Sequence, residues 1–372
     1  STPNSRISAH LSDLNLTLTD VQFKLGKPVQ EGWASYTFSM GFNRRNSFSR
    51  RTTIENPEAN TSYAQSFAEL LGGTDTSQIG FNNLPGLAYY TFLIDPADGS
   101  SNTYVPAFET DELSVNQNFL IEERGAMNDN YAAFGANYSN KFYVGAIISV
   151  PTFSYRRNTE ASEFNSSSES IYLNSGYNES IKANGVGFKA GVGFLVRPIP
   201  LLRFGASIYT PTFYRVNEEY TYTMRTSFTD VGNLSEESDF NEFRYNITTP
   251  FRATASAAFL FNKYGLISID YEYTDFSSAS MSSNSYSFSQ ENRNINQLYT
   301  SVNTIRVGTE WNFDALYLRG GFGFSSSPYN SGLVDEAGDG SVRTYSFGLG
   351  YRHEEFFVDA AYQLMNSRET YV

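Results

Sequence analysis

Side chains that could perform acid–base, nucleophilic or metal chemistry are scarce in this sequence. The chain holds two histidines, His10 and His353, and no cysteine, which excludes thiol nucleophiles, disulfides and cysteine-bound metals. His353 stands beside Glu354 and Glu355 in a predicted short turn, and nothing around either histidine supports a Ser–His dyad. We therefore expect no enzyme, no catalytic residue and no cofactor.

One acidic run, DEAGDG at 335–340, has the carboxylates and turn carbonyls that calcium prefers. It lacks the regular spacing of a calcium-binding loop. A solvated acidic loop explains it better, so we expect no metal site.

Many charged residues fall at every second position within apolar segments, so they share one polar face. The nine that we assign to this face are Lys189, Arg203, Arg252, Asp270, Glu272, Arg306, Glu310, Arg319 and Asp359. Opposite signs on neighbouring strands predict cross-strand ion pairs. We expect Arg252, Arg306 and Arg319 to pair with carboxylates among the other members. The alternative is a surface that selects solutes.

Alternation of period two is clearest in the segment 264–274. Ile267, Ile269 and Tyr271 share one face, and Asp270 and Glu272 share the other. Such a segment is typical of a strand between two different environments. The same pattern predicts strands at 7–25, 33–45, 141–153, 185–196, 201–209, 251–261, 302–313, 315–324, 342–352 and 356–365.

The connections between these strands alternate between short and long. The short ones lie near 26–32, 139–141, 197–201, 262–264, 312–315 and 352–355, and the long ones near 46–114, 156–180, 230–242, 278–298 and 325–341. Aromatic residues cluster beside the short turns. Short periplasmic turns, long extracellular loops and an aromatic girdle are typical of outer-membrane barrels. A soluble β-sandwich also alternates, but not in its connections.

Composition agrees with a membrane-spanning barrel. Aromatic residues make up 16% of the chain, and no stretch of about 18 apolar residues suggests a transmembrane helix. The net charge of −13 argues against a nucleic-acid partner. We predict one domain over 1–372, an all-β, transmembrane, antiparallel up-and-down β-barrel with about 12 strands in this chain.

The parity of the strands predicts more strands than the sequence holds. With six short periplasmic turns, the first and last strands both end on the extracellular side, whereas such barrels keep both termini in the periplasm. We therefore expect one further strand at each end, about 14 in the complete protein. The alternative is that 7–25 holds two segments, because its apolar phase slips between Leu18 and Val21.

Runs across nearly the whole chain resemble the FadL/TodX family of outer-membrane transporters, in the branch labelled "hemin receptor". They are EGWASYTFSMGFNRRNSF (31–48), GLAYYTFLIDP (86–96), GANYSNKFYVGA (135–146), RFGASIYTPTFY (203–214), TTPFRATASAAFLFNKYGLISIDYEYTDFSSA (248–279), IRVGTEW (305–311), LRGGFGFSSSPYNSG (318–332) and YSFGLGYRHEEFFVDAAY (345–362). The resemblance implies a 14-stranded barrel around an N-terminal hatch. We expect the hatch and the last strand to lie outside this sequence.

The resemblance also implies a kinked strand that opens the wall sideways. Counting one missing strand, this strand corresponds to 33–45, with Gly41 as the position for the kink. The plainer interpretation is that Gly41 packs beside an aromatic neighbour. In the long extracellular loop 46–114, residues 61–71 are expected to form an amphipathic helix that caps a hydrophobic site or packs on the rim.

Two functions remain open. The first is a passive uptake channel for small hydrophobic molecules in the outer membrane of a gram-negative bacterium, with lipid, lipopolysaccharide and a hydrophobic ligand as partners. The second is a structural barrel subunit of a larger outer-membrane secretion or protein-assembly complex, with partner proteins. The charged inner face favours keeping the structural-subunit function in view, because a channel for hydrophobic molecules should present fewer charges to its lumen.

Overall fold

The computed structural model describes residues 8–9, 21–25, 31–108, 114–167, 170–330, 339–353 and 356–369. Within these ranges the fold is almost entirely antiparallel sheet, which confirms the all-β prediction. The strands are β1 (Ser8–Ala9), β2 (Val21–Leu25), β3 (Trp33–Ser47), β4 (Arg50–Ala59), β5 (Ile94–Pro96), β6 (Tyr104–Pro106), β7 (Val115–Tyr138), β8 (Phe142–Asn165), β9 (Tyr172–Ile199), β10 (Leu202–Tyr209), β11 (Phe213–Phe228), β12 (Gly232–Glu237), β13 (Asn241–Thr248), β14 (Arg252–Leu260), β15 (Gly265–Asp275), β16 (Ser280–Ser282), β17 (Ser301–Phe313), β18 (Leu316–Ser325), β19 (Asp339–Arg352) and β20 (Phe357–Glu369).

Few helices accompany the sheet in the part of the chain that the structure describes. They are α1 (Tyr63–Leu71), α2 (Leu84–Tyr90), α3 (Ser289–Leu298) and two 3₁₀ turns at Thr76–Gln78 and Phe276–Ser278. Within the described ranges, no helix combines the length and the apolar character needed to cross a membrane.

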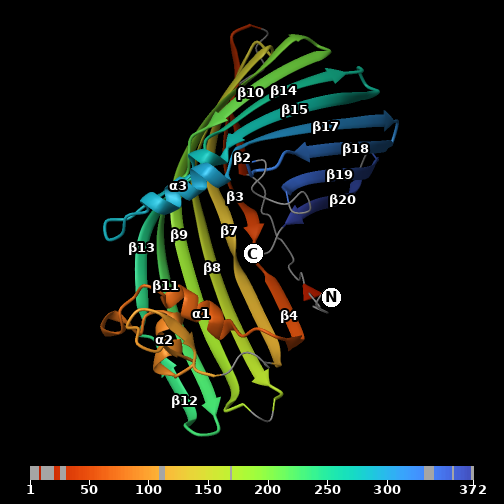
Figure 1. Cartoon of the computed structure of the whole chain (residues 1–372). Coiled ribbons are helices and arrows are strands. Elements are labelled where there is room, and N and C mark those ends of the chain that lie inside the picture. The colour runs from red at the N-terminus through yellow and green to blue at the C-terminus, as the bar shows by residue number, and fades with distance from the viewer. Residues whose placement is uncertain are drawn as a thin grey trace.

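The larger part of the molecule is a sheet that curls round on itself, which we call the curled sheet (Figure 1). Its strand order is β2–β3–β7–β8–β9–β10–β14–β15–β17–β18–β19–β20. These twelve strands match the number expected from the sequence. In the described residues β2 pairs only with β3 and β20 only with β19, so no ladder joins the two edges.

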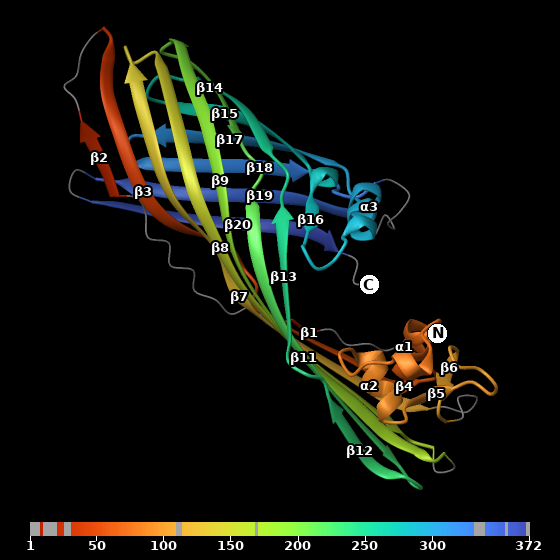
Figure 2. The ribbon, with the colours of Figure 1, turned by 90° about the vertical axis from the view of Figure 1, so that its left-hand side faces the viewer.

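The second part is a twisted sheet that continues three of these strands, which we call the extension (Figure 2). It comprises β4, β11, β12 and the stretches 115–125, 155–165 and 172–184 of β7, β8 and β9. Helices α1 and α2 pack on one of its faces, around a core that includes Val115, Ala161, Tyr172 and Met224. β13 and β16 lie between the two parts.

The pairing partner of β7 changes at Gly125, where the curled sheet meets the extension. On its C-terminal side β7 pairs with β3, with Ala126 opposite Ser47, and on its N-terminal side with β4, with Glu123 opposite Arg50. Gly125 has a φ of 137°, and its carbonyl accepts a hydrogen bond from the Phe48 N–H. Only glycine adopts such a backbone easily.

The expected alternation of connections is present. The tight turns carry left-handed residues, including Asn140, Asn262 and Asp314, and consecutive antiparallel strands place these turns at one end of the curled sheet. The described parts of the long connections lie at the other end, together with α3 and the extension (Figure 2).

Three predicted loops were wrong in part, because much of each is strand. β4 lies inside 46–114, β8 and β9 run through most of 156–180, and β12 and the start of β13 lie inside 230–242. These strands were not predicted from the sequence, because their outward side is polar and their residues show no apolar alternation. Their backbone groups are nevertheless satisfied by the ladder.

The first predicted strand, 7–25, is two short strands in the described residues, β1 and β2, in agreement with the alternative interpretation. The rest of 7–25 lies outside the described residues, as do His10, Glu354 and Glu355.

Candidate functional site

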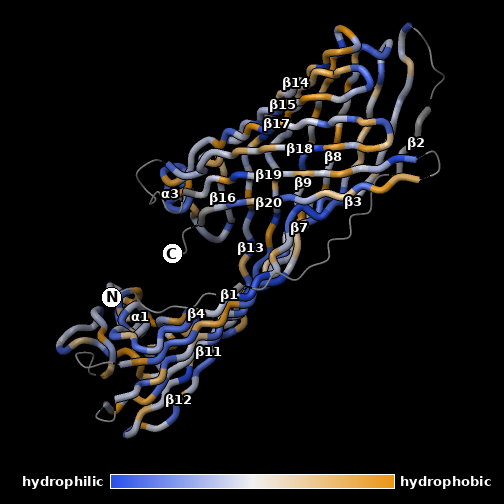
Figure 3. The backbone as a smooth tube through the Cα atoms, turned by 90° about the vertical axis from the view of Figure 1, so that its right-hand side faces the viewer, coloured by the Kyte–Doolittle hydropathy of each residue, from blue (hydrophilic) through white to orange (hydrophobic). Residues whose placement is uncertain are grey.

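Hydrophilic and hydrophobic residues follow one another along the strands of the curled sheet (Figure 3). Its two faces differ as the sequence predicted. On β15 the outward side chains Ile267, Ile269 and Tyr271 are 40%, 48% and 43% exposed. Asp270 and Glu272 point to the concave inner face, where Asp270 lines a hollow of about 510 Å³. The predicted register of this strand is confirmed.

On the inner face, Glu272 lies between two arginines from the neighbouring strands. The Arg252 Nε is 3.4 Å and the Arg306 Nη1 is 3.3 Å from its carboxylate. The three residues come from β14, β15 and β17, which are adjacent in the sheet. The cross-strand pairing expected for Arg252 and Arg306 is therefore observed.

A second ion-pair cluster centres on Arg319 in β18. Its Nε lies 2.6 Å from Glu310 and its Nη1 2.5 Å from Asp359. Gly350 makes room for this cluster, because a Cβ there would lie 2.4 Å from the Asp359 Oδ1 and 3.2 Å from the Arg319 Nη1. The pairing expected for Arg319 is also observed.

Lys189 pairs with a partner that sequence reasoning missed. Its Nζ lies 2.5 Å from the Oδ2 of Asp129 in β7, and the Arg45 Nη1 lies 4.0 Å from the same oxygen. Asp129 is buried at 6% exposure. In the sequence, Asp129 shares a face with Tyr131 two positions on. It was missed because this stretch has no apolar face that alternates with a polar one. Among the described residues, Arg203 makes no ion pair, and its Nε is buried without a hydrogen-bond partner.

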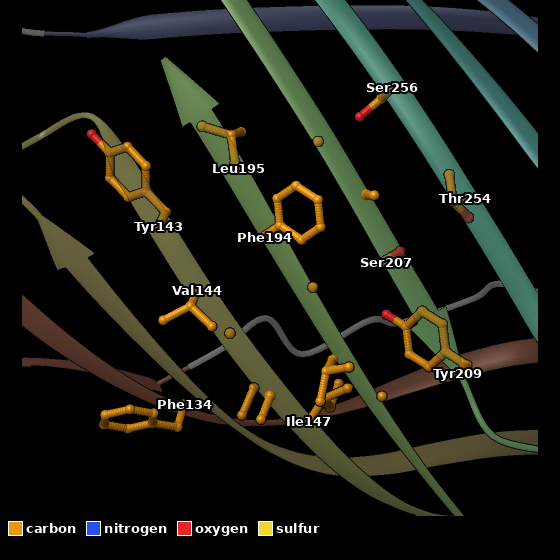
Figure 4. A pocket seen from close by; sticks show the side chains of 18 residues that line it. Phe134, Tyr143, Val144, Ile147, Phe194, Leu195, Ser207, Tyr209, Thr254 and Ser256 are labelled. Carbon is orange, nitrogen blue, oxygen red and sulfur yellow. The ribbon is translucent and has the colours of Figure 1, made fainter. Parts of the chain in front are cut away.

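Small residues cover much of the remaining inner face and leave it hollow. A cavity of about 520 Å³ lies over β8, β9, β10 and β14, with Tyr143, Ile147, Tyr209 and Thr254 around it (Figure 4). Gly191 lies beneath the Tyr209 ring, where a Cβ would come within 2.6 Å of a ring carbon. Glycine therefore lets a ring lie directly on the strand backbone.

Where the curled sheet meets the extension, the inner face becomes aromatic. A cavity of about 430 Å³, which we call the aromatic pocket, is lined by Phe48, Met127, Phe153, Tyr155, Arg157, Ile181, Ala183, Tyr214, Glu218, Tyr245, Ile247 and Thr249. The Phe153 and Tyr214 rings meet edge to face with centroids 5.6 Å apart. They lie against Gly185 and Gly187, where added Cβ atoms would approach them to 2.1 and 2.7 Å.

Polar groups at the rim of the aromatic pocket already have partners within the protein. The Tyr155 hydroxyl donates to Glu123 at 2.6 Å and the Tyr245 hydroxyl to Glu218 at 2.9 Å. Burial, followed by the hydrogen bond to Glu123, raises the pKa of Tyr155 to about 12. The phenol is therefore a stable donor at neutral pH, and the interior of the pocket stays predominantly apolar.

No family model matches this chain, and no curated protein matches it. Among solved structures, the chain is similar to a Pseudomonas aeruginosa FadL homologue, with 10% identity, 98% of this chain and 80% of that chain covered, and a TM-score of 0.47. It is also similar to the CymD monoaromatic hydrocarbon channel (10% identity, 98% and 82% covered, TM-score 0.41). The Pseudomonas putida toluene transporter TodX gives 11% identity, 92% and 83% covered, and a TM-score of 0.40.

The likeness to FadL/TodX-type proteins that the sequence predicted is present in these matches. The strand ladders, and not this likeness, establish the fold of the chain.

Gly41 does not mark an irregularity on the side of β3 that faces β7. The β3–β7 ladder runs through it, with Gly41 opposite Tyr131, and its register shifts lie instead at Trp33/Ser35 and Arg44/Asn46. On the other side the pairing with β2 extends to Met40. A lateral opening at Gly41 stays a prediction.

The predicted helix at 61–71 is α1, but it packs on the extension. Its N-cap is Ser62, and Phe67 and Leu71 are buried in the core beneath the helix. The buried Glu163 carboxylate accepts hydrogen bonds from the Ser62 hydroxyl at 2.5 Å and the Tyr63 N–H at 2.8 Å. Glu163 thus fixes the start of α1 to β8.

Of the remaining chemical candidates, His353 and the end of the acidic run lie within the described residues. His353 is exposed, with its ring centroid 5.6 Å from that of Phe356. Residues 335–338 of the acidic run lie outside the described residues. Within the part of the chain that the structure describes, no group of three histidine or carboxylate residues is placed to hold a metal ion.

Proposed function

We propose that this chain forms the wall of an outer-membrane conduit for passive uptake of small hydrophobic molecules, with the aromatic pocket as the point of capture. The single observation that supports this most is an apolar hollow on the concave face, directly beside the ion-paired wall of the curled sheet. Aromatic walls with a few fixed polar groups are typical of small-molecule sites. The ionisable groups that line the hollow are already paired within the protein, including Tyr155 with Glu123 and Tyr245 with Glu218, so we infer binding and passage, not reaction.

The outward face of the curled sheet supports a position in lipid. Strands such as β14 and β15 have 9 and 11 residues, close to the roughly 9–11 that a spanning strand needs. β7 and β8 have 24 residues each, so about half of each strand continues into the extension on the side of the long connections. We propose that this side is extracellular.

The test is uptake of radiolabelled naphthalene by cells that produce the chain. Ala183→Phe places a ring inside the aromatic pocket, and we expect it to reduce uptake about tenfold, the effect of losing roughly 1.4 kcal/mol of binding. Ala190→Phe is the matched control, because it lies on the same strand and its backbone partner is the outward Ile148. An uncoupler should leave uptake unchanged. Equal uptake by all three proteins, or loss with the uncoupler, would contradict the proposal.

A structural subunit of a larger outer-membrane complex is the second candidate. It is favoured by the edge of β4, which in the described residues pairs on one side with β7 and on the other only with β1, at Thr52 and Thr53. Such an edge can accept a further strand. Purification of the chain from its native membrane in a fixed ratio with another protein, together with the absence of naphthalene uptake, would favour this function.

A further inference from the structure

The outward surface changes character along a line that crosses β9 and β11. Val186 and Phe188 on β9 and Phe213 on β11 are apolar and 51–54% exposed. The next outward positions, away from the curled sheet, are Asn184 and Arg215. In the position proposed above, this line is where lipid tails give way to headgroups.

A polar groove of about 760 Å³ lies on this line. Its outward side chains are Asn184, Arg215, Asn217, Arg244 and Asn246, and Ser283–Ser285 form its far wall. Strand register brings these residues together: Arg215 stands opposite Val186 on one side and Asn246 on the other, and Asn217 stands between Asn184 and Arg244. The groove is therefore built by three adjacent strands and one loop.

Two arginines, Arg215 and Arg244, line this groove, and the Arg215 side chain is the available one. The Arg244 side chain is held by Glu242, with Nη2 2.7 Å and Nε 3.0 Å from the same oxygen. Arg215 is exposed, and none of the described residues forms a hydrogen bond or ion pair with it. A local excess of positive charge is notable in a chain whose net charge is −13.

The donors in the groove suit a phosphate group. A guanidinium presents a planar fork of N–H groups that matches phosphate oxygens, and asparagine amides add neutral donors. The Ser283 hydroxyl already donates to the Arg244 carbonyl oxygen, so the serine loop closes the groove and the asparagines supply its neutral donors. A carboxylate-bearing ligand would need fewer donors than these five side chains supply. Arginines beside an apolar band also match the level at which anionic headgroups lie.

We propose that this groove binds the phosphate of a glycolipid headgroup in the leaflet that surrounds the curled sheet. Arg215 supplies the free charge, Arg244 the second charge, and Asn217 and Asn246 the neutral donors. The lipid tails then continue over Val186, Phe188 and Phe213. The proposal rests on the proposed position in the membrane, because only there does a lipid headgroup reach this line.

The experiment compares three probes on the full chain in a neutral detergent, by native mass spectrometry. The probes are lipid A with both phosphates, lipid A without phosphates, and inorganic phosphate. We expect about tenfold tighter binding of the phosphorylated lipid than of the dephosphorylated lipid, the size of one charge-assisted contact. Arg215→Gln combined with Arg244→Gln should abolish this preference.

Arg225→Gln is the matched control, because Arg225 is exposed on the same outward side of β11, ten residues further into the extension. It should keep the full preference. A preference lost equally in Arg225→Gln would show general charge attraction and overturn the site. Absence of preference in the unaltered chain, or equally tight binding of inorganic phosphate, would also overturn it.

Two further measurements separate misfolding and misplacement from loss of the site. The double variant should insert into phosphatidylcholine vesicles as the unaltered chain does, and the single Arg215→Gln variant should lose most of the preference. Failure of the unaltered chain to insert would count against the proposed function. Insertion without any phosphate preference would count against the groove alone.

Discussion

The curled sheet and the extension share three continuous strands but have opposite polarity. In the curled sheet the outward face is apolar and the inner face carries ion pairs, as on β15 with Ile269 and Glu272. In the extension the part of the inner face under α1 and α2 forms an apolar core, and the outward face is mostly polar. The comparison shows that the period of two fixes which residues share a face, whereas the surroundings decide which face is apolar.

The junction between the two parts should be the position most sensitive to change. A Cβ at Gly125 would lie 2.0 Å from the Ser154 carbonyl oxygen, and its φ is unfavourable for other residues. We expect Gly125→Val to destabilise the protein by roughly 3 kcal/mol or more, from backbone strain and overpacking together.

Urea unfolding and limited proteolysis check this prediction. Gly135→Ala is the matched control in the same strand, because a Cβ there would lie 4.0 Å from the Val144 carbonyl oxygen, an ordinary contact distance. If Gly125→Val and the control unfold at the same urea concentration, the change of pairing from β3 to β4 does not depend on this glycine.

The polarity of the outward faces can be tested by one substitution in each part. Ile269→Arg in the curled sheet should cost roughly 2–4 kcal/mol, the cost of an arginine facing lipid at mid-bilayer. Phe164→Arg in the extension should cost little, although Phe164 is more exposed, at 57% against 48%. Unfolding of both variants from phosphatidylcholine vesicles measures the difference. Equal costs would mean that lipid does not separate the two parts.

The attachment of α1 should depend on pH through Glu163. Burial raises the pKa of this carboxyl above its ordinary value of 4.5, although hydrogen bonds, first from Ser62, act in the opposite direction. The raised pKa means that its stabilising contribution is full below the unfolded pKa and is lost as pH rises through the folded pKa. Acidification from neutral pH should therefore tighten the cap.

A fluorophore on Leu70→Cys, which is 71% exposed in a chain without cysteine, would report urea unfolding of the cap. Glu163→Gln should remove this pH dependence, and the exposed Glu69→Gln should retain it. A cap that loosens on acidification would contradict the assignment.

The inner charges of the curled sheet should contribute least to stability. Arg252 and Arg306 are 42% and 50% exposed, and such pairs contribute about 1 kcal/mol or less. Glu272→Gln should therefore leave urea unfolding nearly unchanged. A large loss of stability would show that the wall of the curled sheet depends on its ion pairs. The extension, in contrast, is held by an apolar core.

Sequence reasoning predicted the curled sheet better than the extension. The faces of β15, the pairing of Arg319 and the helix at α1 followed from alternation and amphipathic spacing, because each has one clearly apolar side. The strand portions 156–165 and 172–180 could not be predicted, because both of their sides carry many polar residues. Their few core residues, Ala161 and Tyr172, pack under α1 and α2, which come from a distant part of the chain. Asp129 was missed for a similar reason, since its partner Lys189 is 60 residues away.

The aromatic pocket also could not be predicted from the sequence. Its rings come from β8, β11, β13 and the segment after β3, and β7 and β9 add further side chains. The residues beneath the rings are Gly185 and Gly187, which look in the sequence like part of an ordinary glycine-rich strand. Only the register shows that each glycine lies beneath an aromatic ring.

The continuity of β7, β8 and β9 through both parts has a mechanical consequence. The β7–β8 ladder pairs Val115 with Asn165 at one end and Tyr138 with Phe142 at the other, and the β8–β9 ladder is almost as long. A force that pulls on the extension along its strands is spread over many backbone hydrogen bonds that must break together. A force across the strands would open them one at a time. The extension can therefore transmit tension along its strands to the wall of the curled sheet without separating from it.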